Sequence, residues 1–175
     1  EETQGLSFLD AMQGTYVRRR YKSRLEWNKC VTLGGRGDSV PHVTDLNGRV
    51  IAIAGAGGGL GPVVAKRLAD AGATLALADR TQAHADAVKD SLGLPEERVD
   101  ARAVDLLDES AANDWVAALT DRFGRVDGLL HLIGGYRGGE PIQSFDLADY
   151  EFLHNLLVRT LQLTTRAFHS PLTES

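Results

Sequence analysis

Several features that mark other classes of protein are missing from this sequence. Cys30 is the only cysteine, so no disulfide can form within the chain; this fits a reducing compartment, and we expect a cytoplasmic protein. No run reaches the about 18 apolar residues that a membrane-spanning helix needs, so we predict no membrane contact. No group of His, Cys, Asp and Glu has the spacing of a metal site, so we predict no metal. The net charge of −5 argues against nucleic acid as a partner.

Residues 1–45 lack the regular hydrophobic spacing of the rest of the chain. They lack the basic N-terminus and the apolar core of a secretory signal peptide. The chain begins at Glu1 rather than Met, so we expect a processed, trimmed or fragmentary N-terminus. A basic run covers 18–24, and a glycine-rich run covers 34–39. We interpret 1–45 as an N-terminal extension that is partly disordered or irregular. The alternative is an arm that binds a partner.

From residue 46 to 175, segments typical of strands alternate with segments typical of helices. The chain is 43% hydrophobic and 25% charged, which is enough apolar material for a core. We predict an α/β domain: a Rossmann-like, doubly wound parallel sheet of about four strands with flanking helices. Val63 and Trp115, at helical spacing, are expected to face the core. The expected strands cover 49–55, 74–79, 99–105 and 126–133, and the expected helices cover 59–71, 81–91, 109–123 and 147–168.

A glycine-rich turn joins the first expected strand to the first expected helix. Gly55, Gly59 and Gly61 are spaced as G-x-x-x-G-x-G. Glycine lets the backbone approach a pyrophosphate closely, and a helix N-terminus offers unpaired N–H groups and a partial positive charge. In this strand–turn–helix context, we predict that these glycines and Leu60 hold the pyrophosphate of a dinucleotide. The alternative is a tight structural turn without a ligand.

Asp79 ends the second expected strand, 18 residues after Gly61. A carboxylate at this place accepts hydrogen bonds from the adenosine ribose hydroxyls and repels a 2′-phosphate, so the sequence favours NAD over NADP. The neighbouring Arg80 complicates this preference, because a guanidinium there could hold that phosphate. Alternatively, Asp79 stabilises the N-terminus of the helix at 81–91.

With these residues placed, the chain from 46 to about 170 resembles the short-chain dehydrogenase/reductase family. The glycine spacing matches the cofactor motif of that family, with Ala54 where threonine is usual. The resemblance implies that Asp105 and Leu106 hold the adenine ring of the cofactor.

The stretch 127–134 aligns with a family segment that usually ends Asn-Asn-Ala-Gly. His131 and Leu132 replace the two asparagines, which tie the central sheet together in the family. The resemblance implies that Ile133 and Gly134 lie at the ribose on the nicotinamide side of the cofactor.

Asn155, 21 residues after Gly134, matches the helix asparagine of the family's catalytic tetrad. The resemblance implies that Asn155 holds a water or the tetrad lysine. The other tetrad members are a serine and a Tyr-x-x-x-Lys pair that transfers a proton. None of the four tyrosines has a lysine four positions later, and neither residue type occurs after residue 155. We therefore expect a chain truncated before the catalytic serine and Tyr-x-x-x-Lys of a longer enzyme, and inactive by itself.

The activity that the resemblance implies is NAD(P)-dependent hydride transfer between the cofactor and a small-molecule carbonyl or alcohol substrate. The alternative is a non-catalytic nucleotide-binding or dimerisation module, since the Tyr/Lys pair is missing. The expected helix at 147–168 has apolar residues on more than one face. The equivalent helix of the family packs against a second subunit, so we expect a homo-oligomer formed through 147–168.

Overall fold

The computed structural model describes residues 45–174, and the expectations for residues 1–44 lie outside the described part. The strands are β1 (Val50–Ala54), β2 (Thr74–Asp79), β3 (Val99–Ala103) and β4 (Gly128–His131). The helices are α3 (Gly61–Asp70), α4 (Gln82–Leu92), α5 (Glu109–Phe123), α6 (Leu147–His154) and α7 (Thr160–Glu174). A π-helical segment, η3 (Asn155–Arg159), joins α6 to α7, and two short 3₁₀ turns cover Glu96–Arg98 and Ile142–Ser144.

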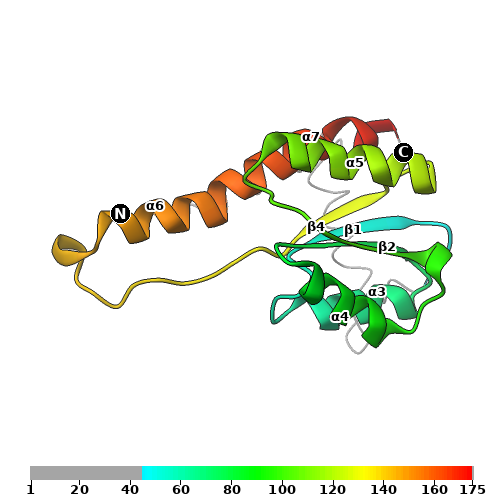
Figure 1. Cartoon of the computed structure of the whole chain (residues 1–175), viewed down its shortest axis with the longest axis horizontal. Coiled ribbons are helices and arrows are strands. Elements are labelled where there is room, and N and C mark those ends of the chain that lie inside the picture. The colour runs from blue at the N-terminus through cyan, green and yellow to red at the C-terminus, as the bar shows by residue number, and fades with distance from the viewer. Residues whose placement is uncertain (1–44, 175) are drawn as a thin grey trace, which may run out of the picture. The chain divides into compact units, whose positions relative to one another are not determined.

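The four strands form one parallel sheet in the order β3-β2-β1-β4. Helices α3 and α4 cover one face of the sheet, and α5 and α7 cover the other (Figure 1). The chain moves outward from β1 to β3 and then returns to the other side of β1. The strand order therefore reverses between β1 and β4, and such a switch point is where open α/β sheets place ligands. The predicted doubly wound α/β fold is confirmed.

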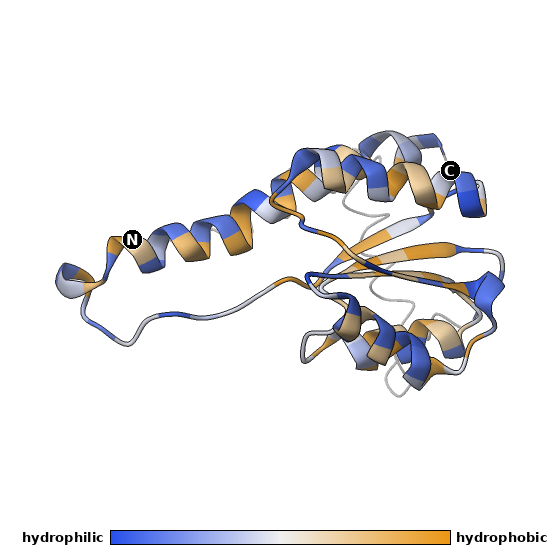
Figure 2. Ribbon diagram, in the orientation of Figure 1, coloured by the Kyte–Doolittle hydropathy of each residue, from blue (hydrophilic) through white to orange (hydrophobic). Residues whose placement is uncertain are grey.

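The two faces of the sheet carry side chains of different size. On one face, Trp115 of α5 and Phe168 of α7 meet edge to face, with ring centroids 5.0 Å apart. Small residues of β1 and β2 leave room for these rings: Ala52, Ala54, Ala76 and Ala78. On the other face, Ile53, Leu75 and Leu77 fill the space below α3 and α4. Figure 2 shows the resulting concentration of hydrophobic residues on the strands. Trp115 is buried, as predicted.

Some expected boundaries and one expected core residue are wrong. Val63 is 68% exposed, because the neighbouring Val64 faces the sheet and consecutive helix residues point about 100° apart. The last helix does not stop at residue 168 but continues to Glu174, with Pro171 inside it. The third strand ends at Ala103, two residues before the expected end.

The long helix, which consists of α6, η3 and α7, begins beyond the carboxyl edge of the sheet, and a loop without strands leads to it (Figure 1). The carboxylate of Asp146 caps α6 by accepting a hydrogen bond from Ala148 N at 2.8 Å. The guanidinium of Arg137 lies 2.6 Å from Asp149 and 3.7 Å from the ring centroid of Phe152. Arg137 thus fastens the loop that follows β4 to the first turns of α6.

Candidate functional site

The glycine turn begins where β1 ends. Gly55 has φ +82°, and a Cβ atom on it would lie 3.0 Å from the backbone nitrogen of Ile133. The N–H groups of Gly55 and Ala56 both donate to the carbonyl of Ala78, at 2.9 and 3.0 Å. Glycine at position 55 therefore allows the turn to pack directly between the ends of β2 and β4.

Two further glycines of the motif have different surroundings. A Cβ on Gly61 would lie 2.0 Å from the carbonyl oxygen of Ala56, so only glycine lets α3 start this close to the strand end. A Cβ on Gly59 would meet nothing within 4 Å, and the φ of Gly59 is not positive. Leu60 at the N-cap position is 59% exposed and makes no side-chain capping bond. The surface above Gly59 is therefore open, and the helix N-terminus behind it has no side-chain cap.

Asp79 connects the end of β2 to the glycine turn. Its Oδ2 accepts a hydrogen bond from the backbone N–H of Gly57 at 2.9 Å, and its Oδ1 lies 3.2 Å from Nδ1 of His84. The Asp79 side chain is 12% exposed. Helix α4 has Thr81 as its N-cap and no acid in its first turn, and the side chain of Asp79 contacts the glycine turn and His84. Arg80 is exposed, and within residues 45–174 it forms no ion pair.

His84 is not among the site residues predicted from the sequence, although it contacts Asp79. The feature of the sequence that could have indicated it is a histidine five positions after the acid that ends β2. This spacing places the histidine in the first turn of the following helix. A Cβ on Gly57 would lie 2.7 Å from Cβ of His84, so this histidine packs against the glycine turn as well as against Asp79.

The residues expected at the adenine ring follow β3. Val104 N–H donates to the carbonyl of Asp79 at 2.8 Å, so this segment lies beside the end of β2. Asp105 is exposed, and its Oδ1 accepts from Leu107 N at 3.0 Å. Leu106 is 5% exposed and belongs to the core below α5. Contact of Leu106 with a ligand would therefore involve its backbone rather than its side chain.

The segment after β4 returns to the glycine turn and to the long helix. Ile133 is half-buried behind Gly55, and Gly134 is exposed, with nothing within 4 Å of a Cβ built on it. A Cβ on Gly135 would lie 2.8 Å from Cδ2 of Leu156. The π-helical segment that contains Asn155 therefore packs on the backbone that follows Gly134.

His131 holds the beginning of α7 against β4. Its Nε2 lies 3.3 Å from Oγ1 of Thr160, whose hydroxyl donates to the carbonyl of Leu156 at 2.6 Å. Burial lowers the pKa of His131, which favours the neutral imidazole, and its buried Nδ1 has no hydrogen-bond partner among the described residues. In this position, His131 supports the π-helical segment that includes Asn155. Such segments often occur at functional sites.

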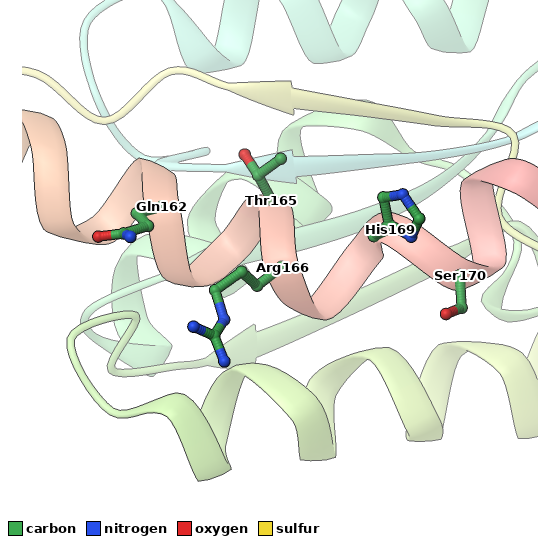
Figure 3. A pocket seen from close by; sticks show the side chains of 5 residues that line it. All are labelled: Gln162, Thr165, Arg166, His169 and Ser170. Atoms are coloured by element: carbon green, nitrogen blue, oxygen red, sulfur yellow. The ribbon is translucent and has the colours of Figure 1, made fainter.

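Two hollows lie on the surface of the long helix. Asn155 lines one of about 260 Å³ together with Tyr150, Glu151 and His154. The other, of about 530 Å³, contains none of the predicted site residues (Figure 3). Its lining residues all lie on α7: Gln162, Thr165, Arg166, His169 and Ser170.

Several predicted site residues come together at the carboxyl edge of the sheet. Contacts link the glycine turn to Asp79, to the end of β2 and to Ile133. Residues 104–106 join this group through Asp79, and Asn155 joins it only indirectly, through its neighbour Leu156 and Gly135. Within residues 45–174, no three metal-ligating side chains form a group, and no helix is long and apolar enough to cross a membrane.

Known proteins are similar to this part of the chain in sequence. The family model described as short chain dehydrogenase matches residues 49–174. Levodione reductase from Leifsonia aquatica is 34% identical over 118 residues, which is 66% of this chain and 44% of the relative. Sulfoacetaldehyde reductase 2 from Chromohalobacter salexigens is 30% identical over 126 residues, which is 72% of this chain and 50% of the relative.

Solved structures show the same similarity. The crystal structure of 3-ketoacyl-(acyl-carrier-protein) reductase from Brucella melitensis complexed with NADH superposes with a TM-score of 0.67 at 30% identity. That match covers 74% of this chain and 52% of the reductase. The chain thus spans about half the length of the relatives that it matches.

Proposed function

Because this chain belongs to the short-chain dehydrogenase family, we propose that its glycine turn binds a nicotinamide dinucleotide. We further propose that the protein transfers hydride between this cofactor and a small-molecule carbonyl or alcohol substrate. The observation that carries the proposal is the hydrogen bond from Gly57 N–H to Asp79, which sets a carboxylate beside an open glycine turn. These are the two groups that the phosphate and ribose parts of a dinucleotide require.

The pyrophosphate would lie over Gly59, Leu60 and Gly61. The open space above Gly59 gives it room, and the N-terminus of α3 has no side chain that would compete as a cap. The partial positive charge of the helix end favours an anion at this place.

Asp79 would hold the adenosine ribose. One lone pair of Oδ2 accepts from Gly57 N–H, and one lone pair of Oδ1 faces Nδ1 of His84. The remaining lone pairs of the two oxygens can accept hydrogen bonds from the ribose hydroxyls. The negative charge opposes a 2′-phosphate, which supports NAD over NADP. Arg80 is the residue that would reduce this preference.

The remaining proposed contacts are at the two ends of the cofactor. Asp105 and the backbone of Leu106 would hold the adenine, since they follow Val104, which bonds to the carbonyl of Asp79. Ile133 and Gly134 would lie at the ribose on the nicotinamide side. Asn155 would hold a water or a lysine there, and Leu156, its neighbour on the π-helical segment, packs on the backbone that follows Gly134.

The nicotinamide supplies hydride chemistry when it is bound. A proton must also move to or from the substrate oxygen, and the family's Tyr-x-x-x-Lys pair is not present in these 175 residues. We therefore assign binding and orientation to this chain and assign no proton-transfer step to its residues.

The test is an Asp79→Ala substitution with calorimetric titration of NADH. We expect at least a tenfold loss of affinity, because charge-assisted hydrogen bonds to the ribose are removed. Asp121→Ala, on the exposed surface of α5, is the control and should bind like the wild type. Unchanged affinity in Asp79→Ala would show that the ribose lies elsewhere.

A further inference from the structure

We propose that His131 is a positioning residue, which acts through Thr160 to hold Asn155 at a fixed place relative to the glycine turn. This placement favours binding of the nicotinamide half of the cofactor. The role rests on the proposed cofactor site and belongs to a residue that replaces one of the two asparagines usual in the family.

The hydrogen bonds of Thr160 differ from those of a residue inside an α-helix. Its backbone N–H donates to the carbonyl of Asn155, five residues back, whereas α-helical geometry would direct it to Leu156, four residues back. The Leu156 carbonyl thus loses this donor, and the Thr160 hydroxyl replaces it at 2.6 Å. Thr160 is only 4% exposed, so water has little access to these groups. The Thr160 side chain therefore compensates for the carbonyl that the π-helical geometry leaves free.

These bonds determine which nitrogen of His131 carries a proton. The single hydroxyl proton of Thr160 is donated to the Leu156 carbonyl, so the contact of Oγ1 with Nε2 of His131 at 3.3 Å needs a proton on Nε2. Burial lowers the pKa of His131 and favours the neutral ring, which has one proton. Nδ1, which is buried and has no partner within residues 45–174, then carries none. This tautomer leaves no buried N–H group of the ring unpaired.

His131 also lies beside the strand that leads into the glycine turn. It is opposite Ala54 in the parallel pairing of β4 with β1, and Leu132 N–H donates to the Ala54 carbonyl at 2.8 Å. Ala54 is the last residue before the glycine turn. Contacts therefore run without a gap from this turn through β4 and Thr160 to the carbonyl of Asn155. Because the pyrophosphate and the nicotinamide side are proposed to lie at the two ends, His131 sets the separation of their binding groups.

The experiment compares the dissociation constants of NADH and ADP, measured by calorimetry on the 175-residue chain. ADP keeps the adenosine and two phosphates but lacks the ribose and the ring of the nicotinamide side. His131→Leu removes the donor at Nε2, whereas His131→Gln keeps an N–H group near that position. Thr160→Val and Thr160→Ser are a second pair, which removes or keeps the hydroxyl. Circular dichroism and melting temperatures show whether each variant folds.

We expect roughly three- to tenfold weaker NADH binding by His131→Leu and Thr160→Val, with ADP affinity within about twofold of the wild type. His131→Gln and Thr160→Ser should bind both ligands like the wild type, because the hydrogen bonds are kept. A merely structural role would change both affinities by the same factor. Equal losses for NADH and ADP, or no loss for NADH, would therefore overturn the role of His131. If His131→Leu does not fold, the Thr160 pair decides.

Nuclear magnetic resonance tests the tautomer without a ligand. The ¹⁵N signals of the His131 ring should show a proton on Nε2 and none on Nδ1, and the opposite result would overturn the bond to Thr160 and the role built on it. Failure of the cofactor site looks different. A wild type that binds neither NADH nor ADP would overturn both proposals, whereas equal affinity of the wild type for the two ligands would overturn only the role of His131.

Discussion

At the scale of single residues, the glycines of one motif serve two different purposes. Gly55 and Gly61 are required by the protein itself, because Cβ atoms at these positions would meet the backbone of Ile133 and Ala56. Gly59 has no such neighbour in the described structure and needs no special φ. A requirement for glycine at position 59 would therefore come from a ligand, and the substitution of these residues separates folding from binding.

We expect Gly59→Ala to keep the melting temperature within about 2 °C of the wild type and to weaken NADH binding at least tenfold, because its methyl group would occupy the space proposed for the pyrophosphate. Thermal unfolding and calorimetry on the same sample measure both effects. Gly61→Ala is the contrasting variant and should lose about 1–3 kcal/mol of stability by overpacking. NADH binding by Gly59→Ala with wild-type affinity would contradict the proposed phosphate position.

At the scale of elements, an ion-pair cluster ties the starts of β1 and β4 together at the edge of the sheet opposite the site. The Asp127 carboxylate accepts hydrogen bonds from Val50 N–H at 2.9 Å, from Nη1 of Arg49 at 2.6 Å, and from Nε and Nη2 of Arg125. Its side chain is 6% exposed. Burial alone would raise the pKa of Asp127, but the hydrogen bonds from Arg125, Val50 and Arg49 lower it to about 2, from an ordinary value of 3.8.

The lowered pKa makes this cluster fully stabilising above about pH 4, and the stabilisation is lost progressively between about pH 4 and about pH 2. A carboxylate whose pKa is lower in the folded state contributes stability above its unfolded pKa and loses it as the pH falls through the folded pKa. We therefore expect the free energy of unfolding to fall between about pH 4 and about pH 2, and expect Asp127→Asn to cost about 2 kcal/mol at pH 7. Urea unfolding at each pH measures this. Asp121→Asn on the exposed surface of α5 is the matched control. Equal stabilities of the two variants at pH 7 would show that the cluster contributes little.

The order of the elements was predictable from sequence, whereas the details at the site depend on contacts between distant residues. Apolar runs and helical spacing were sufficient for the four strands and the helices between them. The π-helical segment at Asn155 was not predictable, because it is supported by His131 and Thr160, which are 29 residues apart. His84 was missed for the same reason: its importance comes from the side chain of Asp79 and the backbone of Gly57.

At the scale of the whole molecule, apolar side chains remain exposed on the long helix. Six large ones lie on its surface, from 38% to 75% exposed: Leu147, Tyr150, Phe152, Leu157, Val158 and Leu161. Figure 2 shows hydrophobic residues along the part of this helix that extends past the sheet. Strand β4 also lies at an edge of the described sheet. Exposed apolar surface of this kind marks an interaction site, and we propose that a second copy of the chain covers the helix.

The oligomer prediction is tested by light scattering at micromolar concentration. We expect the wild type to be a dimer or tetramer and Val158→Glu to shift it toward the monomer, because a charge would be buried in the contact. Val63→Glu is the matched control, since Val63 is exposed on α3, away from the proposed contact. A monomeric wild type would contradict the prediction.

The central claim is that a nicotinamide dinucleotide binds at the glycine turn at the carboxyl edge of the sheet. The most direct test is a titration of the ¹⁵N-labelled chain with NADH, followed by the backbone amide signals in NMR. We expect saturable shifts at the amides of residues 57–61, at Asp79 and at 104–106, with much smaller shifts around Asp127 at the opposite edge. No shifts, or shifts confined to the surface of α7, would contradict the claim.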